Sequence, residues 1–531
     1  MKKLLLCIFA VALALVAFTA CRGDDPTPVP PAPVPPPVVT PAPATPGTPV
    51  ATPEPAAPVD YTISILTVSH SGELISTDHP AIRQLEELTG YRIELDMILN
   101  ANFEEQMNLR LAARDLPGIV AITGNTLPIV QAARGGAFWD ITDHIPQWPY
   151  LARANPAILR NISIDGRAFG MYRQRHFVRP GMVYRSDWLD YLGLPVPETL
   201  ADLEYTLIAF TERNPQPNGG NTYGMAWTGG HLGPFHDLAV MHGAPNRWEV
   251  VNGNFVPWFE HPGFTEAMEF SRRLFDAGAI NPDFIALPTG EWALEFGAGL
   301  TGWHMDVADE ARRSANRLRD NEFMTQEELD AGEMVWVMGA VANAQGERRI
   351  RAAGGNAGYV AISTIGAPTD ADLAHHLAFI NMLNSPRGQT IVSRGAEGYN
   401  WEYVGGGRIR LLTADEIPPG MEVLEGLNQF MMRDADAMPL YGVNSREDRI
   451  NEVWRINLDH AVEDPSIPLA TLAPAWTANM GALNRLIDDA VSRYVAGIDD
   501  RAAFLAFVSQ WYAEGGQDAI NELNAAFAAS Q

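Results

Sequence analysis

Lysine and cysteine are almost absent from this chain. Its only lysines are Lys2 and Lys3, and its only cysteines are Cys7 and Cys21. Beyond residue 21 the chain can therefore supply no P-loop lysine and no lysine Schiff base. With one cysteine left after residue 20, an internal disulfide and a cysteine-based metal site are also excluded. No H-E-x-x-H or G-x-S-x-G motif occurs, so the sequence carries no recognisable signature of a hydrolase.

Positive charge is scarce as well. Residues 21–531 contain 35 arginines and 64 acidic residues, which gives a net charge of −29. Such a surface repels the phosphates of nucleic acids and the headgroups of anionic lipids. We therefore expect no nucleic-acid partner and no direct binding to a membrane surface.

The N-terminus has the organisation of a bacterial export signal. Two lysines precede an apolar run of 14 residues, Leu4 to Ala17, which is too short to anchor the chain across a bilayer. Thr19-Ala20-Cys21 then resembles the lipobox of bacterial lipoproteins, whose signal is removed and whose cysteine is acylated. We predict a signal peptide over residues 1–20 and lipidation of Cys21, with the protein held on the extracytoplasmic face of the cell membrane. An ordinary secreted protein is the alternative.

Proline dominates the next segment. Residues 26–58 hold 15 prolines and a single charged residue, Glu54. This composition cannot build a core and favours extended polyproline II. We predict a lipidated N-terminus and proline-rich linker over residues 21–59, which lifts a globular body, residues 60–531, off the membrane.

The body alternates between strand-like and helix-like segments. The pattern predicts strands over 61–69, 91–99 and 118–123, with helices over 79–88, 103–113 and 126–133. A second such region starts near Gly181 and includes a capping box at Thr199 and a hairpin turn at Asn252-Gly253. The alternation predicts an α/β protein with mainly parallel sheets. Residues 307–370 are expected to be irregular, and helices are expected from about Asn479 to the C-terminus.

One stretch resembles a known family. Residues 185–227, RSDWLDYLGLPVPETLADLEYTLIAFTERNPQPNGGNTYGMAW, are similar to a segment of the family 1 extracellular solute-binding proteins. The resemblance is closest to the lipoprotein members that serve ABC importers of oligosaccharides. Three further segments resemble the family and lie in the family's order along the chain: MNLRLAARDLPGIVAI (107–122), DAGAINPDF (276–284) and AFINMLNSPRGQTIVSRGAEGYNWEYV (378–404).

This resemblance implies a two-lobed periplasmic-binding-protein-like fold of type II, with crossover hinge segments between the lobes. We expect the first lobe over about 60–180 plus part of 330–400, and the second over about 181–330 plus the C-terminal helices. The implied function is to capture an oligosaccharide, or another small polar solute, between the lobes and to deliver it to the permease of an ABC importer. We expect a monomer without a cofactor or catalytic residues.

Candidate ligand-binding residues follow from the chemistry of sugars. The apolar face of a pyranose packs on indole rings, while its hydroxyl groups need polar partners. Most of the 13 tryptophans should be core residues, but three lie beside glycine-rich turns or at strand ends: Trp227, Trp303 and Trp401. Asp306 and Asn125 are the expected polar partners, with Arg173 as a further candidate. His70 and Asn125 also follow predicted strands, where open α/β sheets bind ligands.

Other readings stay open from the sequence alone. A secreted carbohydrate-active enzyme could use an unrecognised carboxylate pair, and a stalked interaction or sensor protein would suit the linker equally well. Some relatives bind calcium in an acidic loop, but the matching loop here, Asn214 to Asn221, has amides or gaps in place of carboxylates. We therefore expect no metal site there.

Overall fold

The computed structural model describes residues 59–69, 78–215, 221–229, 232–287, 291–413, 416–421, 425–432 and 444–530. The expected signal peptide, Cys21, the proline-rich linker and His70 lie outside these described residues. Within them, no helix combines the length and the apolar character that crossing a bilayer requires.

A five-stranded mixed sheet organises the N-terminal part of the body. Its strands lie in the order β2 (Arg92–Leu99), β1 (Thr62–Ser69), β3 (Ile119–Ile122), β12 (Asn356–Ile362) and β4 (Gly170–Gln174). The strands expected over 61–69, 91–99 and 118–123 are confirmed. β1 runs parallel to β2 and β3, but β12 runs antiparallel to both β3 and β4. The expectation of a mainly parallel sheet is therefore wrong, because a strand from much later in the chain inserts between β3 and β4.

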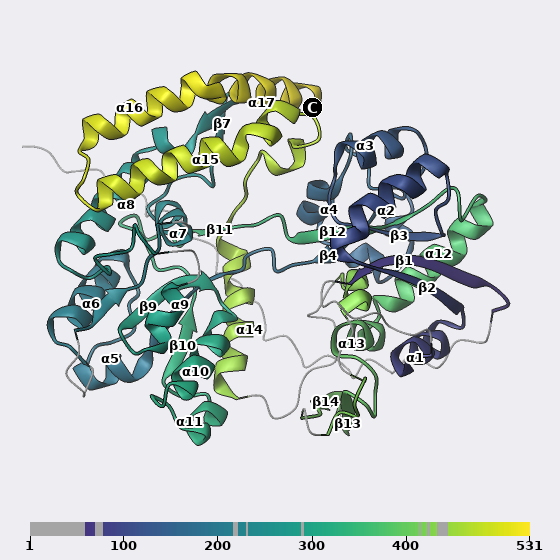
Figure 1. Ribbon diagram of the computed structural model, residues 1–531, viewed down its shortest axis with the longest axis horizontal. Helices are drawn as coiled ribbons and strands as arrows, with labels where there is room; N and C mark the ends of the chain where they lie inside the picture. Colours follow the sequence, from purple (N-terminus) through teal and green to yellow (C-terminus); the bar gives the residue numbers. More distant parts are fainter. Residues whose placement is uncertain are drawn as a thin grey trace, which may run out of the picture. The chain divides into compact units, whose positions relative to one another are not determined.

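Local signals set the ends of the helices around this first sheet. Before α1 (Pro80–Thr89), the His79 ring accepts a hydrogen bond from the backbone N–H of Ala81, and proline occupies the first turn. The helix ends at Gly90, whose φ of 77° is the left-handed conformation that glycine adopts without strain. The other helices here are α2 (Asn100–Ala113), α3 (Leu127–Arg134), α4 (Pro156–Ile162), α12 (Asp370–Leu383) and α13 (Pro386–Arg394) (Figure 1).

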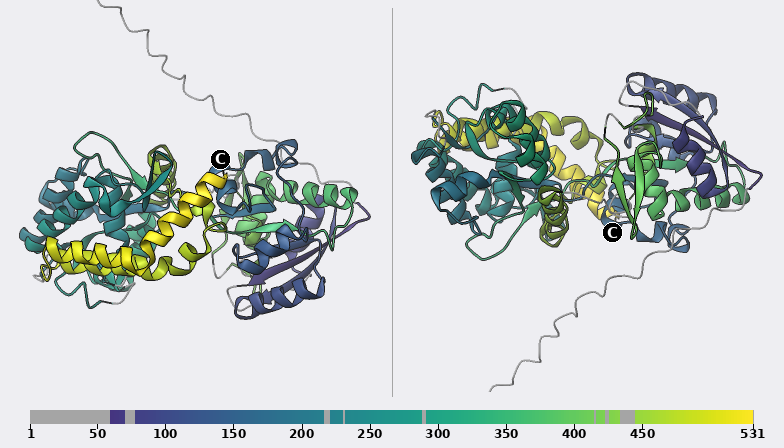
Figure 2. Two further views of the ribbon diagram at one scale, coloured as in Figure 1. Left: turned by 90° about the horizontal axis from the view of Figure 1, so that it is seen from above. Right: turned by 90° about the horizontal axis from the view of Figure 1, so that it is seen from below.

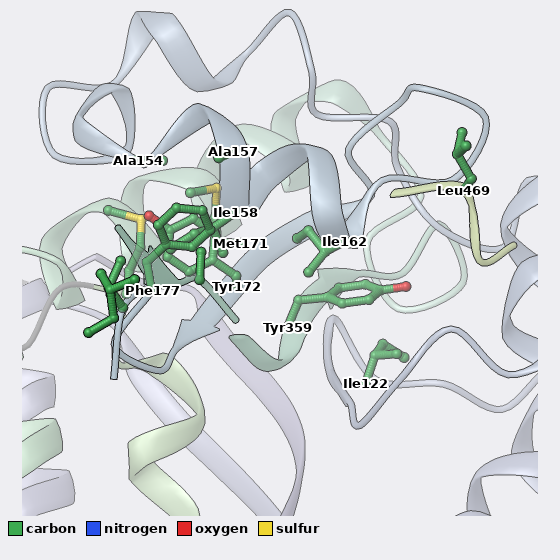
Figure 3. Close-up of a cluster of buried hydrophobic side chains, with 14 of the residues drawn as sticks. Ile122, Ala154, Ala157, Ile158, Ile162, Met171, Tyr172, Phe177, Tyr359 and Leu469 are labelled. Atoms are coloured by element: carbon green, nitrogen blue, oxygen red, sulfur yellow. The ribbon is translucent and has the colours of Figure 1, made fainter. Parts of the chain in front are cut away.

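A buried cluster joins α4 to the sheet (Figure 3). Ile158 and Ile162 of α4 lie beside Tyr172 of β4 and Tyr359 of β12, and all four side chains are almost fully buried. Close packing of β4 on β12 depends on Gly170, since a Cβ at this position would lie 2.3 Å from the carbonyl oxygen of Val360.

A second, four-stranded sheet follows. Its strands lie in the order β10 (Val335–Met338), β5 (Pro180–Arg185), β9 (Thr301–Val307) and β6 (Tyr223–Met225). β5 is antiparallel to β10 and β9, whereas β6 is parallel to β9. The helices of this part are α5 (Ser186–Leu192), α6 (Leu200–Glu212), α7 (Gly233–Met241), α8 (Pro262–Asp276), α9 (Trp292–Gly297), α10 (Glu310–Asp320) and α11 (Gln326–Ala331).

The second part tests two local expectations. The capping box before α6 is confirmed, because Thr199 Oγ1 accepts from the N–H of Asp202 while the Asp202 carboxylate accepts from the N–H of Thr199. The expectation that residues 307–370 are irregular is wrong, since this stretch contains α10, α11, β10, β11 (Ile350–Arg351) and β12. The short strands there carry too little periodicity of their own to be recognised before their sheet partners are known.

Three helices form the C-terminal part: α15 (Pro474–Val495), α16 (Arg501–Trp511) and α17 (Gln517–Ser530). α15 packs against α16, α17 and α8 (Figure 2). The hairpin expected at Asn252-Gly253 is confirmed as β7 (Trp248–Val251) and β8 (Asn254–Pro257). Its Trp248 contacts Trp476 of α15 edge to face, with 5.2 Å between the ring centroids.

The remaining elements are short, except α14 (Ser445–Asn457), which packs against β10 of the second sheet. They are the hairpin β13 (Trp401–Gly405) and β14 (Arg408–Leu411), α14, β15 (Ala461–Val462), a π-helical turn over Tyr512–Gly516, and the 3-10 turns Ile145–Gln147, Leu151–Arg153, Trp258–Glu260, Glu425–Phe430, Leu458–His460 and Ile467–Leu469.

Candidate functional site

Among the described residues, three stretches of chain run between the part of the body around the first sheet and the part around the second, and we call them the crossover segments. The first, residues 175–179, joins β4 to β5, and the second, residues 352–355, joins β11 to β12. The third, residues 463–466, follows β15, which pairs with β11, and leads to the 3-10 turn Ile467–Leu469, which contacts α4.

The first two crossover segments are hydrogen-bonded to each other. The N–H of Arg175 donates to the carbonyl of Gly355 at 2.9 Å, and the N–H of Ala353 donates to the carbonyl of Phe177 at 2.8 Å. Gly355 has a φ of 73°, and a Cβ there would lie 2.5 Å from Cγ1 of Ile158, so the position requires glycine. The first of these two segments begins at the carboxyl end of β4. Open α/β sheets bind ligands at such strand ends.

A cavity of about 140 Å³ lies where these segments meet the second sheet. Four charged side chains line it: Arg179, Asp237, Asp306 and Arg351. Its remaining walls are Pro180, Gly233, Met305, Val307, Ala352 and Ala353. The cavity thus offers guanidinium donors and carboxylate acceptors within a small space.

An ion pair between Arg351 and Asp237 fixes one wall of the cavity. Arg351 Nε lies 2.9 Å from Asp237 Oδ1, and the Asp237 side chain is only 3% exposed. Burial would lower the pKa of the Arg351 guanidinium, but Asp237 and, more weakly, Asp306 outweigh it and raise that pKa. Arg351 therefore stays charged. Asn246 also holds the neighbouring backbone in place, because its Nδ2 donates to the carbonyls of Ala352 and Val462 at 2.8 and 2.9 Å.

Of the expected ligand-binding residues that the structure describes, Asp306 alone lines this cavity. It lies near the end of β9, opposite Gly181 of β5. Arg173 is buried within β4, two residues before the first crossover segment. Asn125 is held by neighbours of the first sheet, since its Oδ1 accepts from the Tyr359 hydroxyl at 2.9 Å and its Nδ2 donates to the Ile162 carbonyl at 3.1 Å.

The three candidate tryptophans do not offer exposed faces. Trp227, Trp303 and Trp401 are each no more than 1% exposed. Trp303 stacks on Tyr184 with 4.8 Å between centroids, Trp227 meets Phe284 edge to face, and Trp401 Nε1 donates to the carbonyl of Gly395 at 2.7 Å. In this structure all three are core residues, and the partial exposure expected of ligand-stacking indoles is not found. Trp303 is buried because its strand, β9, lies between β5 and β6 inside the second sheet.

One aromatic pair at the crossovers was not anticipated from the sequence. His176, in the first crossover segment, stacks on Trp454 of α14 with 3.5 Å between ring centroids and an interplanar angle of 17°. Trp454 is partly buried. A signal was present, since His176 lies in the basic run Arg173 to Arg179, but nothing local indicated which helix would cover it.

Comparison with known proteins places this geometry in context. The chain is 28% identical over 486 residues to "Lipoprotein LipO" of Bacillus subtilis (strain 168), covering 88% of this chain and 93% of that protein. It is 28% identical over 454 residues to the polygalacturonan/rhamnogalacturonan-binding protein YtcQ of the same organism, covering 84% and 88%. No protein-family model matches the chain.

A solved structure shares the fold. It is the HMO-binding, ABC-transporter-associated solute-binding protein of Bifidobacterium longum infantis ATCC 15697, with a TM-score of 0.63 and 16% identity over 88% of this chain and 99% of that one. In sequence and in fold the chain is similar to extracellular solute-binding proteins. The expected α/β fold of this class is thereby confirmed. YtcQ and the HMO-binding protein are both binding proteins by name, and we assign no catalytic residue to this chain.

A larger cavity of the body fits a polar ligand less well. It measures about 940 Å³ and lies between the first-sheet part and residues 463–472 and 527–530. Its walls are rich in proline and leucine. Of its four charged groups, Arg160 pairs with Glu463 at 2.8 Å, Asp165 pairs with Arg134, and Asp464 accepts hydrogen bonds from Ser466. We therefore place the candidate site at the smaller, charged cavity.

The loop expected to lack calcium lies mostly outside the described residues. The hydroxyl of Thr222, the residue after the loop, lies 3.4 Å from Oδ1 of Asn214 at the start of the loop. Within the described part of the chain, no group of three or more His, Cys, Asp or Glu side chains is arranged to hold a metal ion.

Proposed function

We propose that this protein captures an oligosaccharide outside the cytoplasm and delivers it to the permease of an ABC importer, while a lipid on Cys21 holds it at the membrane. Similarity over 84% of the chain to a protein that binds polygalacturonan and rhamnogalacturonan is the observation that carries this proposal. The HMO-binding, ABC-transporter-associated protein with the same fold supports both an oligosaccharide as the ligand and an ABC importer as the partner.

We assign ligand contact to the charged cavity at the crossover segments. Sugar hydroxyl groups both donate and accept hydrogen bonds, and the cavity supplies Asp306 as an acceptor and Arg179 as a donor. At about 140 Å³ it is smaller than typical ligand sites of roughly 300–1,000 Å³. It would therefore hold one part of a chain of sugars, and the rest of the ligand would lie along the crossover segments. Closure of the two lobes around the ligand would complete the site.

A glycan-library thermal-shift screen tests the proposal. A ligand at 100 times its dissociation constant should stabilise the folded protein by about 2.7 kcal/mol. The bound glycans should then lose about tenfold in affinity in Asp306→Asn, since a hydrogen bond to a charged group contributes roughly 1.5–3 kcal/mol. Asp320→Asn is the matched control, because Asp320 is an exposed partner of Arg319 at the end of α10. Absence of any stabilising glycan would overturn the proposal.

A further inference from the structure

Basic residues gather at the crossover segments of this acidic protein. Residues 171–180 contain Arg173, Arg175, Arg179 and His176 and no acidic residue. Residues 348–356 contain three more arginines and again no acidic residue. Six of the 35 arginines after the signal therefore lie in two short stretches, in a chain with 64 acidic residues.

The fold brings the two stretches together. The hydrogen bonds from Arg175 to Gly355 and from Ala353 to Phe177 join their backbones, and Arg179 and Arg351 line the same cavity. We define Arg175, Arg179, Arg349 and Arg351, from these two joined stretches, as the basic strip, of which Arg179 and Arg351 line the cavity.

Three of the four arginines of this strip take no part in the ion pairs that the described residues form. Arg351 pairs with Asp237, but Arg175, Arg179 and Arg349 form no ion pair with any described residue. Elsewhere arginines are commonly paired, as in Arg167 with Asp140 and Asp143. Arg175 is exposed, whereas Arg179 and Arg349 are half-buried, so the guanidinium groups of the latter two are partly withdrawn from water without an ion-pair partner among the described residues.

We propose that the ligand carries a carboxylate, as a uronate-containing oligosaccharide does, and that Arg175 and Arg179 bind it. This inference rests on the proposed function. A neutral sugar needs no net positive charge, whereas a protein of charge −29 repels an anionic ligand unless positive charge is concentrated where the ligand binds. The planar guanidinium group matches a carboxylate with two parallel hydrogen bonds. The Asp306 carboxylate can accept hydrogen bonds from hydroxyl groups, and Asp237 is neutralised by Arg351.

Matched trisaccharides test this directly by isothermal titration calorimetry. The probes are galacturonate, glucuronate and mannuronate trimers, each paired with the neutral trimer of the same ring and linkage, together with a sulfated galactose trimer. At least one uronate trimer should bind at least tenfold more tightly than its neutral counterpart. Raising the salt concentration from 0.05 to 0.5 M should weaken the uronate complex several-fold and leave neutral binding unchanged, because salt screens exposed charges.

Variants locate the effect. Arg175→Gln and Arg179→Gln should each weaken uronate binding by roughly tenfold to a hundredfold, as expected for loss of a charge-assisted hydrogen bond, with less than a threefold change for the neutral trimer. Arg92→Gln is the control, since Arg92 is an exposed arginine of β2 that forms no ion pair with the described residues. Melting temperatures of all variants should agree within about 2 °C.

The outcomes separate the two proposals. If a neutral trimer binds as tightly as its uronate, or if the arginine variants weaken both equally, the carboxylate assignment is wrong while the carbohydrate function stands. If the sulfated trimer binds more tightly than every uronate, the strip selects sulfate and the assignment to a carboxylate also fails. If no trimer and no glycan of the wider library binds, the proposed function itself fails.

Discussion

Replacing Trp303 by alanine separates a core role from a ligand-binding role. The indole is fully buried and stacks on Tyr184 within the second sheet. A buried tryptophan removes about 150–250 Å² from water, which at about 25 cal/mol per Å² corresponds to an upper limit near 4–6 kcal/mol. Truncations of this kind cost about 3–5 kcal/mol in practice. For a unit of the size of the second-sheet part this predicts a fall in melting temperature of roughly 6–20 °C.

The assay measures stability and affinity on the same preparations. Melting is followed by calorimetry, and glycan affinity is measured well below the melting transition, where the variant remains folded. Trp303→Phe is the matched control, because it keeps an aromatic ring against Tyr184 and should recover more than half of the lost stability. Affinity should change by less than about threefold in both variants. A melting temperature within 2 °C of the parent protein together with a tenfold loss of affinity would refute the core assignment.

Three further predictions follow from single sites. Gly170→Ala should destabilise the first sheet by more than about 2 kcal/mol, because the new Cβ would overlap the Val360 carbonyl, whereas Gly124→Ala, with open space around it, should be nearly neutral in the same denaturation assay. Burial lowers the pKa of His304 to about 3. The unfolded chain protonates this histidine near pH 6.5, so folding stability should fall by roughly 2 kcal/mol between pH 6.5 and pH 5. His304→Asn should flatten that slope in urea titrations, and an unchanged slope would disprove the assignment. Cys21→Ala should release the protein from cells or leave its signal uncleaved, and lipid labelling that persists in this variant would contradict acylation at Cys21.

Local sequence signals predicted local structure well. The ends of α1 follow from His79, Pro80 and Gly90, and the start of α6 follows from the Thr199 capping box. Each signal acts on neighbouring residues through hydrogen bonds or, for Pro80, through its fixed φ. The expected C-terminal helices are present too, although α15 begins at Pro474, slightly before the predicted position.

Long-range features were harder to predict. The position of β12 between β3 and β4 depends on partners far away in the chain, so its own seven residues could not reveal an antiparallel neighbour. The same limit applies to the site. Asp306 was expected, but the pairing of Arg351 with Asp237 and the stacking of His176 on Trp454 join residues that no local pattern connects.

The tryptophans show a different limit. Glycine-rich flanks are typical of turns near ligands, but they also occur where a strand packs tightly. Gly302, beside Trp303, would place a Cβ 2.3 Å from the Phe210 ring and 2.4 Å from the Trp188 ring. The glycines next to this indole therefore reflect close packing in the core, and sequence alone did not distinguish that from a binding surface.

The most direct test of the whole account is a calorimetric titration of the protein with the tightest glycan from the screen, followed by chromatography of the recovered ligand. We expect saturable binding of one glycan per protein molecule, with every molecule of the glycan recovered intact after prolonged incubation. Shorter sugar products in the recovered fraction, or the absence of a saturable heat signal with any glycan, would contradict it.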